Sequence, residues 1–233
     1  MALTRASKVG RTNSTGNPIT QSVTITTADR LVVLLLKTVG SGNRAGGSPL
    51  FNGVAMTQAN STQKAAASPE CSAEIWYFLN PLPGTYNLVI PNTGSQSIFY
   101  TIETAQVPRG AGTVLVQANG GNATSTNPTP GAVTVREAGC LAWAIVASGA
   151  QTWAPSAQAG TNIANTDDGA DGGGEQYSQG PALGSLTLNW TFGTSDDYGA
   201  VVALFGQVNA HNFENYKGVR ADDGVCVTGG KIR

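Results

Sequence analysis

Hydrophobic and polar positions alternate along this chain in short runs, which is the pattern of β-strands. The clearest run, Glu74-Ile75-Trp76-Tyr77-Phe78-Leu79, stops at Asn80-Pro81 and restarts at Tyr86-Asn87-Leu88-Val89-Ile90. Asn-Pro and the glycine that follows are turn residues between two apolar runs. The segment therefore predicts a strand, a tight turn and a second strand.

The same pattern continues over most of the chain. Leu31 to Leu36 is continuously apolar, which indicates a strand covered on both faces, and Asn52-Gly53 indicates a hairpin. A chain of about ten short strands separated by turns is typical of a sandwich or jelly roll. The predicted strands cover residues 19–27, 30–38, 50–57, 73–79, 85–90, 97–106, 113–118, 132–136, 140–147, 185–192 and 200–208. We therefore predict an all-β, antiparallel β-sandwich of the jelly-roll type.

The segments without alternation divide the chain into three parts. Residues 1–19 are polar and are predicted to form an extended N-terminal arm, 20–208 a single β-sandwich domain, and 209–233 a C-terminal arm. Two irregular connections are expected at 119–131 and 154–184. No internal repeat is evident, and the Leu/Val-rich strands near residues 31 and 200 are interpreted as core strands rather than copies.

Composition supports this organisation and narrows the class of partner. Thirty Gly, eleven Pro and only 12% charged residues fit short strands joined by many turns. A net charge of −1 without a basic cluster argues against nucleic acid as a partner. So few charges leave room for uncharged contacts with other protein copies, although solvated loops of the same composition explain the pattern equally well.

No segment predicts secretion or a membrane span. The N-terminus carries positive charge without an apolar stretch behind it, and the longest apolar run has six residues, from Leu31 to Leu36. We expect synthesis in the cytoplasm and no contact with a membrane. The cysteines Cys71, Cys140 and Cys226 are interpreted as small buried residues, and a disulfide within or between copies is the alternative.

One acidic loop is the only candidate metal site. Asp167, Asp168, Asp171 and Glu175 alternate with glycines, and such oxygen ligands on a mobile backbone suit calcium. Their spacing departs from that of an EF-hand loop, so a solvated turn is the competing interpretation and no cofactor is otherwise expected.

The chain offers no evident catalytic constellation. Glu74 and Glu103 are the strand carboxylates that a glycosidase pair would need, but each occupies an alternating position where a solvent-facing residue is expected. The single histidine, His211, lies in a polar tail without a nucleophile motif. We therefore predict that the protein is not an enzyme.

Aromatic residues allow one binding hypothesis. Tryptophan and tyrosine side chains can stack on sugar rings, but in strands they are usually part of the core. Trp153, beside Pro155, is the best candidate for an exposed glycan contact. The other aromatic residues considered are Trp76, Trp143, Trp190, Tyr77, Tyr86 and Tyr100.

The chain resembles a family of β-sandwich proteins in several segments that occur in the same order. These segments are Leu31-Val32-Val33, Phe51 to Thr57, Glu74 to Gly84 and the strand near Cys140 to Ile145. Members of that family occur in tailed bacteriophage virions and in bacterial surface proteins. The resemblance covers about residues 20–206 and implies a fold rather than catalytic residues. Bacterial surface members usually follow a signal peptide, which favours the virion members here.

The resemblance and the two polar arms together predict a bacteriophage virion protein. We expect a homo-oligomeric capsid decoration or cement protein whose arms reach the major capsid protein or other virion proteins. The alternatives are a tail or fibre component, or a module that binds carbohydrate or a host receptor. The arm residues expected to make contacts are Arg5, Lys8, Arg11, Phe213 and Tyr216.

Overall fold

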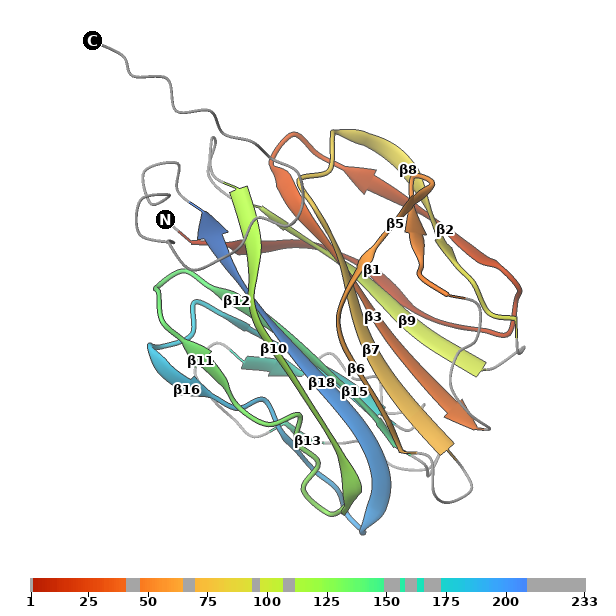
Figure 1. Ribbon diagram of the computed structural model, residues 1–233, viewed down its shortest axis with the longest axis vertical. Helices are drawn as coiled ribbons and strands as arrows, with labels where there is room; N and C mark the ends of the chain where they lie inside the picture. Colours follow the sequence, from red (N-terminus) through yellow and green to blue (C-terminus); the bar gives the residue numbers. More distant parts are fainter. Residues whose placement is uncertain are drawn as a thin grey trace.

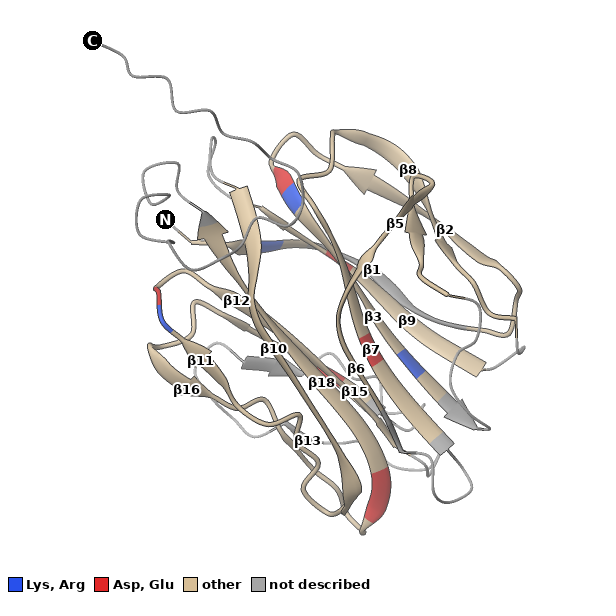
Figure 2. Cartoon of the chain, viewed as in Figure 1, with Lys and Arg blue, Asp and Glu red and all other residues tan. Residues whose placement is uncertain are grey.

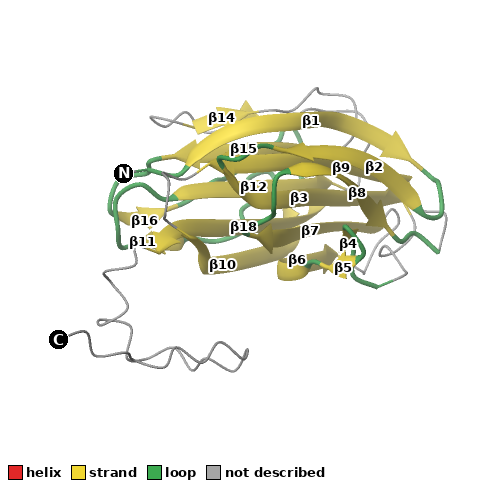
Figure 3. Ribbon diagram, turned by 90° about the horizontal axis from the view of Figure 1, so that it is seen from above, coloured by secondary structure: helices red, strands yellow, loops and turns green. Residues whose placement is uncertain are grey.

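The computed structural model describes residues 2–40, 47–64, 70–93, 97–106, 112–148, 156–157, 163–165 and 173–208. Within these residues every regular element is a β-strand and every strand pair is antiparallel (Figure 1). Seen from above, the strands lie in stacked sheets (Figure 3). The predicted all-β sandwich is confirmed.

The first half of the chain forms a jelly roll. A five-stranded sheet in the order β1-β9-β3-β7-β6 lies against a four-stranded sheet in the order β2-β8-β4-β5, and the chain passes between them as it proceeds. An apolar cluster that includes Leu34 of the larger sheet and Leu88 of the smaller one fills the space between them. The strands are β1 (Thr4–Ser14), β2 (Ile19–Ile25), β3 (Asp29–Gly40), β4 (Leu50–Phe51), β5 (Val54–Ala55), β6 (Thr57–Lys64), β7 (Glu70–Leu79), β8 (Gly84–Ile90) and β9 (Ser97–Gln106).

The second half repeats this arrangement. Its larger sheet has the order β10-β18-β12-β15-β14, and the pairs β11-β16 and β13-β17 accompany it. Its apolar cluster includes Ala144 of the larger sheet and Leu188 and Trp190 of the outer segments. The strands are β10 (Gly112–Ser125), β11 (Val133–Val135), β12 (Leu141–Ser148), β13 (Ser156–Ala157), β14 (Ile163–Asn165), β15 (Gly173–Gln179), β16 (Gly184–Leu186), β17 (Trp190–Thr191) and β18 (Asp196–Val208).

Strand register shows that the two halves correspond residue by residue. In the first half Leu31 pairs with Leu79 and Ala105; in the second, Leu141 pairs with Gln179 and Phe205. Each first strand also carries a β-bulge at the matching place, between Arg5 and Ser7 in β1 and between Leu115 and Gln117 in β10. A bulge is a specific local device, so its repetition supports a true internal duplication.

The turns match as well. Positions 81–90 and 181–190 have the same succession of buried and exposed residues. Asn80 and Gly180, just before each turn, have positive φ values of 51° and 62°, and their amides donate to Arg30 and Cys140 carbonyls at 2.8 and 2.9 Å. The expectation that the chain has no internal repeat is therefore wrong. Only a sparse motif marks the repeat in the sequence, Pro81-x-x-Gly84-Thr85-x-x-Leu88 against Pro181-x-x-Gly184-Ser185-x-x-Leu188.

The two larger sheets pack against each other and form a third apolar cluster, the central core. Leu31, Val33 and Leu35 of β3 face this core, while Val32, Leu34 and Leu36 face the outer sheet of their own half. The continuous apolar run predicted as a strand covered on both faces is confirmed. An edge-to-face ring contact connects the halves within the core, where the ring centroids of Phe205 and Tyr77 lie 5.4 Å apart.

The structure differs from the prediction at the polar strands. Residues 4–14, expected to belong to an arm, form β1, which pairs with β9 along its length. Likewise β10 continues through Ser125 into the expected loop, and β15 lies inside the expected loop 154–184. These strands contain few apolar residues, because they lie toward sheet edges or direct polar side chains into the interior. The alternation of apolar and polar residues therefore does not predict them. The predicted C-terminal arm, 209–233, lies outside the described residues.

Candidate functional site

The most unusual feature of the described residues is a row of buried and half-buried polar side chains along one edge of the central core. It consists of residues from the two central sheets, and we call it the polar edge: Arg5, Thr101, Glu103, Glu175, Tyr177 and Gln179. β1 and β9 of the first half supply the first three and β15 of the second half supplies the others. The polar edge therefore joins the two halves.

An ion pair lies at the centre of the polar edge. Arg5 Nε and Nη2 donate to the two carboxylate oxygens of Glu103 at 2.6 and 2.8 Å, a bidentate arrangement. The Arg5 guanidinium also lies over the ring of Tyr177, 4.6 Å from its centroid. The hydrogen bonds to Glu103 raise the pKa of Arg5, although partial burial opposes this shift. Arg5 therefore stays charged and holds β1, β9 and β15 together.

Two further contacts extend this row across the interface. Thr101 Oγ1 donates to Glu175 Oε1 at 2.5 Å, with both side chains buried. The backbone amide of Arg5 donates to the Gln179 side-chain carbonyl at 3.1 Å. Since hydrogen-bonded partners satisfy these buried groups, the polar edge stabilises one specific pairing of the two halves.

The matching edge on the other side of the core is apolar. The duplication relates Arg5 to Leu115, Glu103 to Ala203 and Thr101 to Val201. It also relates Glu175 to Ile75 and Gln179 to Leu79. The apolar members all belong to or pack on the central core. The two halves thus share a backbone plan but meet through a polar edge on one side and an apolar edge on the other.

Lys37 is a further buried charged group in this interface. Its side chain is 1% exposed and its Nζ has no hydrogen-bond partner among the described residues. The Nζ lies 5.1 Å from the centroid of the Phe99 ring, in the geometry of a cation–π contact. The corresponding residue of the second half is Ala147.

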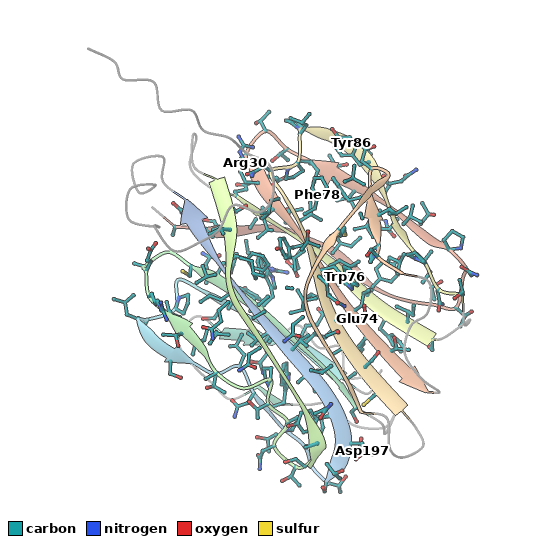
Figure 4. All side chains as sticks on the ribbon, in the orientation of Figure 1. Arg30, Glu74, Trp76, Phe78, Tyr86 and Asp197 are labelled. Atoms are coloured by element: carbon teal, nitrogen blue, oxygen red, sulfur yellow. The ribbon has the colours of Figure 1, made fainter. Side chains whose placement is uncertain are left out.

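The two carboxylates considered as a catalytic pair do not face each other. Both are buried, against the expectation that they face solvent. Glu103 faces the central core, whereas Glu74 lies on the opposite face of the same sheet, where it accepts a hydrogen bond from Trp76 Nε1 at 2.7 Å (Figure 4). Their placement on opposite faces prevents them from flanking one substrate bond.

Other predicted site residues are placed as follows. Lys8 and Arg11 lie in β1 with Arg5, and Glu175 lies in β15 rather than in a loop. Outside the described residues lie Asp167, Asp168, Asp171, Trp153, His211, Phe213 and Tyr216. The aromatic residues interpreted as core behave as such, since Trp76, Trp143, Trp190 and Tyr100 are buried. Tyr77 and Tyr86 are half-buried.

The cysteines that the structure describes support the interpretation as buried apolar residues. Cys71 and Cys140 are buried, and Cys226 lies outside the described residues. Burial raises the pKa of the Cys140 thiol, and the nearby charge of Glu137 raises it further. At neutral pH Cys140 is therefore a poor nucleophile.

Charges are sparse over the described chain (Figure 2). Several of the buried carboxylates, Glu74, Glu103 and Glu175, are used in internal contacts. In the described part of the chain, no cluster of three His, Cys, Asp or Glu residues is arranged to hold a metal ion. Nor does any described segment form a helix long and apolar enough to cross a membrane. Comparison with known proteins found no matching family model, curated protein or solved structure.

Proposed function

We propose that this chain is a non-enzymatic structural protein of a bacteriophage virion, a capsid decoration or cement protein that packs on the shell formed by the major capsid protein. The observation that carries the proposal is the fused pair of β-sheet halves with a continuous central core. In this body the two larger sheets are buried against each other, so each half covers an apolar face of the other.

The use of the buried polar groups supports this role. Arg5 pairs with Glu103, Thr101 with Glu175, and Trp76 with Glu74, so these groups stabilise the body of the protein. The virion context comes from the resemblance of residues 20–206 to virion β-sandwich proteins. Low charge over a large surface is compatible with close packing among protein copies.

Incubation of the purified chain with native capsids, followed by cryo-electron microscopy, tests the proposal. Regular density for two stacked sandwiches on the outer shell is the expected result. Density on the tail would instead support the tail or fibre assignment. An absence of particle binding, together with a glycan-array signal that Trp153→Ala abolishes, would replace the proposal with carbohydrate recognition.

A further inference from the structure

Strand β10 combines a position at the edge of a sheet with exposed apolar side chains. It is the outermost strand of its sheet, and β18 is its only neighbour in that sheet among the described residues. Val114 and Val116 of β10 are 37% and 38% exposed. A single exposed valine is ordinary, but two of them on one edge strand favour the addition of a further strand to the sheet.

The two valines lie close together on the same face of the sheet. Val114 pairs in register with Gly206, which has no side chain to cover it. A Cβ at Gly206 would lie 2.9 Å from Val116 Cγ2, so Val116 lies over the same glycine. Leu115, between the two valines, packs against the central core instead. The beginning of β10 therefore presents a small apolar surface at the edge of the sheet.

The sequence of β10 lacks the residues that usually protect an edge strand. Charged side chains and proline discourage pairing with another chain, and the fourteen residues of β10 include neither. The counterpart of β10 in the duplication is β1, which has the same bulge but carries the cations Arg5, Lys8 and Arg11. Residues 113–118 form an uncharged segment without proline or glycine and with high β-propensity, which is typical of strands that pair between chains.

Charge and sequence favour a second copy of this chain as the partner. A strand that pairs with its own copy about a two-fold axis does so antiparallel, and the residues before and after the central position then oppose each other. With Leu115 at the centre, Val114 of each copy opposes Val116 of the other. Two apolar cross-strand pairs form in this way, and no like charges meet.

We infer that β10 is a self-association surface, at which two copies of the chain pair antiparallel about Leu115 and join their five-stranded β10-β18-β12-β15-β14 sheets into one. β6 lies along the same side of the molecule as β10 (Figure 3), and its only charged residue is Lys64 at its end. The edge of the other central sheet therefore adds little charge repulsion to this approach. The inference concerns the free protein and goes beyond the proposed function, which it does not require.

The test measures the mass of the full-length chain and of two charge variants by sedimentation. Val114→Lys/Val116→Lys and Val114→Glu/Val116→Glu each place like charges opposite one another in the inferred pairing. We expect the parent to be a dimer and each variant to lose about 100-fold in dimer affinity. An equimolar mixture of the two variants should dimerise again, because each lysine then opposes a glutamate.

A matched control places a charge at an exposed apolar residue outside β10. Leu183, in the turn between β15 and β16, is 66% exposed, so Leu183→Lys should dimerise as the parent does. Circular dichroism verifies that every variant is folded, as expected for substitutions at exposed positions.

Three results would overturn the inference. The first is a parent that sediments as a monomer at every concentration, and the second is a dimer that persists in both charge variants, which would place the contact on another surface. The third is a failure of the mixed variants to dimerise, which would contradict the pairing about Leu115. None of these results depends on binding to particles, so the capsid experiment tests the proposed function separately.

Discussion

At the scale of single residues, the polar edge is the feature with the clearest energetic consequence. Glu103 is 1% exposed and its carboxylate is neutralised by Arg5. Removing one partner of a buried pair leaves an uncompensated charge, whereas replacing both with apolar residues is often neutral or stabilising. The other edge of the same core shows which apolar residues fit, namely Leu115 and Ala203.

We therefore predict that a single substitution in this pair destabilises the protein more than the double substitution does. Arg5→Leu should lower the free energy of unfolding by about 3 kcal/mol, because it leaves Glu103 buried without its cation. Arg5→Leu/Glu103→Ala, which copies the apolar edge, should recover most of that loss. Urea denaturation of the parent, Arg5→Leu, Glu103→Ala and the double variant gives the coupling energy. Additive losses in the double variant would show that the pair is not coupled.

Lys37 gives a second prediction at this scale. Its Nζ is buried without a hydrogen-bond partner among the described residues, and the contact with Phe99 offsets only part of the desolvation. Lys37→Met keeps the volume and removes the charge, so we expect the free energy of unfolding to rise by about 1 kcal/mol. Lys37→Ala is the matched control and should lower it, because it leaves a cavity. Thermal and urea unfolding measure both, and a less stable methionine variant would contradict the argument.

At the scale of strands, the approach of the two halves depends on small residues. β6 of the first half lies over β10 and β18 of the second, where the Thr62 hydroxyl donates to the Ala200 carbonyl at 3.1 Å. A Cβ at Gly120 of β10 would lie 2.5 Å from the Thr62 methyl carbon. A side chain at position 120 would therefore push β6 away from β10.

This geometry predicts a destabilising substitution and its partial rescue. Gly120→Ala should lower the free energy of unfolding by about 2 kcal/mol, since overpacking forces neighbouring groups to shift. Thr62→Ser removes the methyl group but keeps the hydroxyl, so Gly120→Ala/Thr62→Ser should regain part of the loss. Equilibrium unfolding of the four proteins tests the pair. If Gly120→Ala were as stable as the parent, β6 would be able to shift away from β10 without lowering the free energy of unfolding.

The burial and the position of each strand in its sheet also explain which strands the sequence predicts. β3 and β12 are buried on both faces and appear as apolar runs. β1 and β6 are edge strands, and β15 directs Glu175, Tyr177 and Gln179 into a polar interface. An edge strand is held mainly by backbone pairing with its neighbour. Because this pairing does not require alternating apolar side chains, the sequence pattern does not predict the strand.

At the scale of the whole molecule, each half depends on the other for burial of its larger sheet. In the first half, Leu31, Val33, Leu35 and Ile75 face the second half and are at most 1% exposed. An isolated half would expose this entire face, and an exposed apolar face of that size promotes association.

We accordingly predict that residues 1–107 expressed alone do not form a stable monomer. The fragment should dimerise through the exposed face of the β1-β9-β3-β7-β6 sheet or aggregate. Light scattering measures its mass, and Leu35→Lys within the fragment, which charges that face, should shift the population away from the dimer. A monodisperse, folded monomer of the unmodified fragment would show that the central core is dispensable.

The sequence by itself determined the fold class, the main buried strands and their turns. Alternation and apolar runs report how a strand divides its side chains between core and solvent, and the runs at 30–38 and 97–106 correspond closely to β3 and β9. Asn-Gly and Asn-Pro likewise mark turns through their own backbone preferences. These are local properties, so they are visible without a structure.

Tertiary structure alone decided the duplication and the polar edge. The halves share few residues because many different apolar side chains fill equivalent core positions, as Val33 and Trp143 do. The pairing of Arg5 with Glu103, and of Thr101 with Glu175, joins strands far apart in the chain. From the sequence, a charged residue in a strand is predicted to face solvent. Its buried partner becomes apparent only when the packing of one half on the other is known.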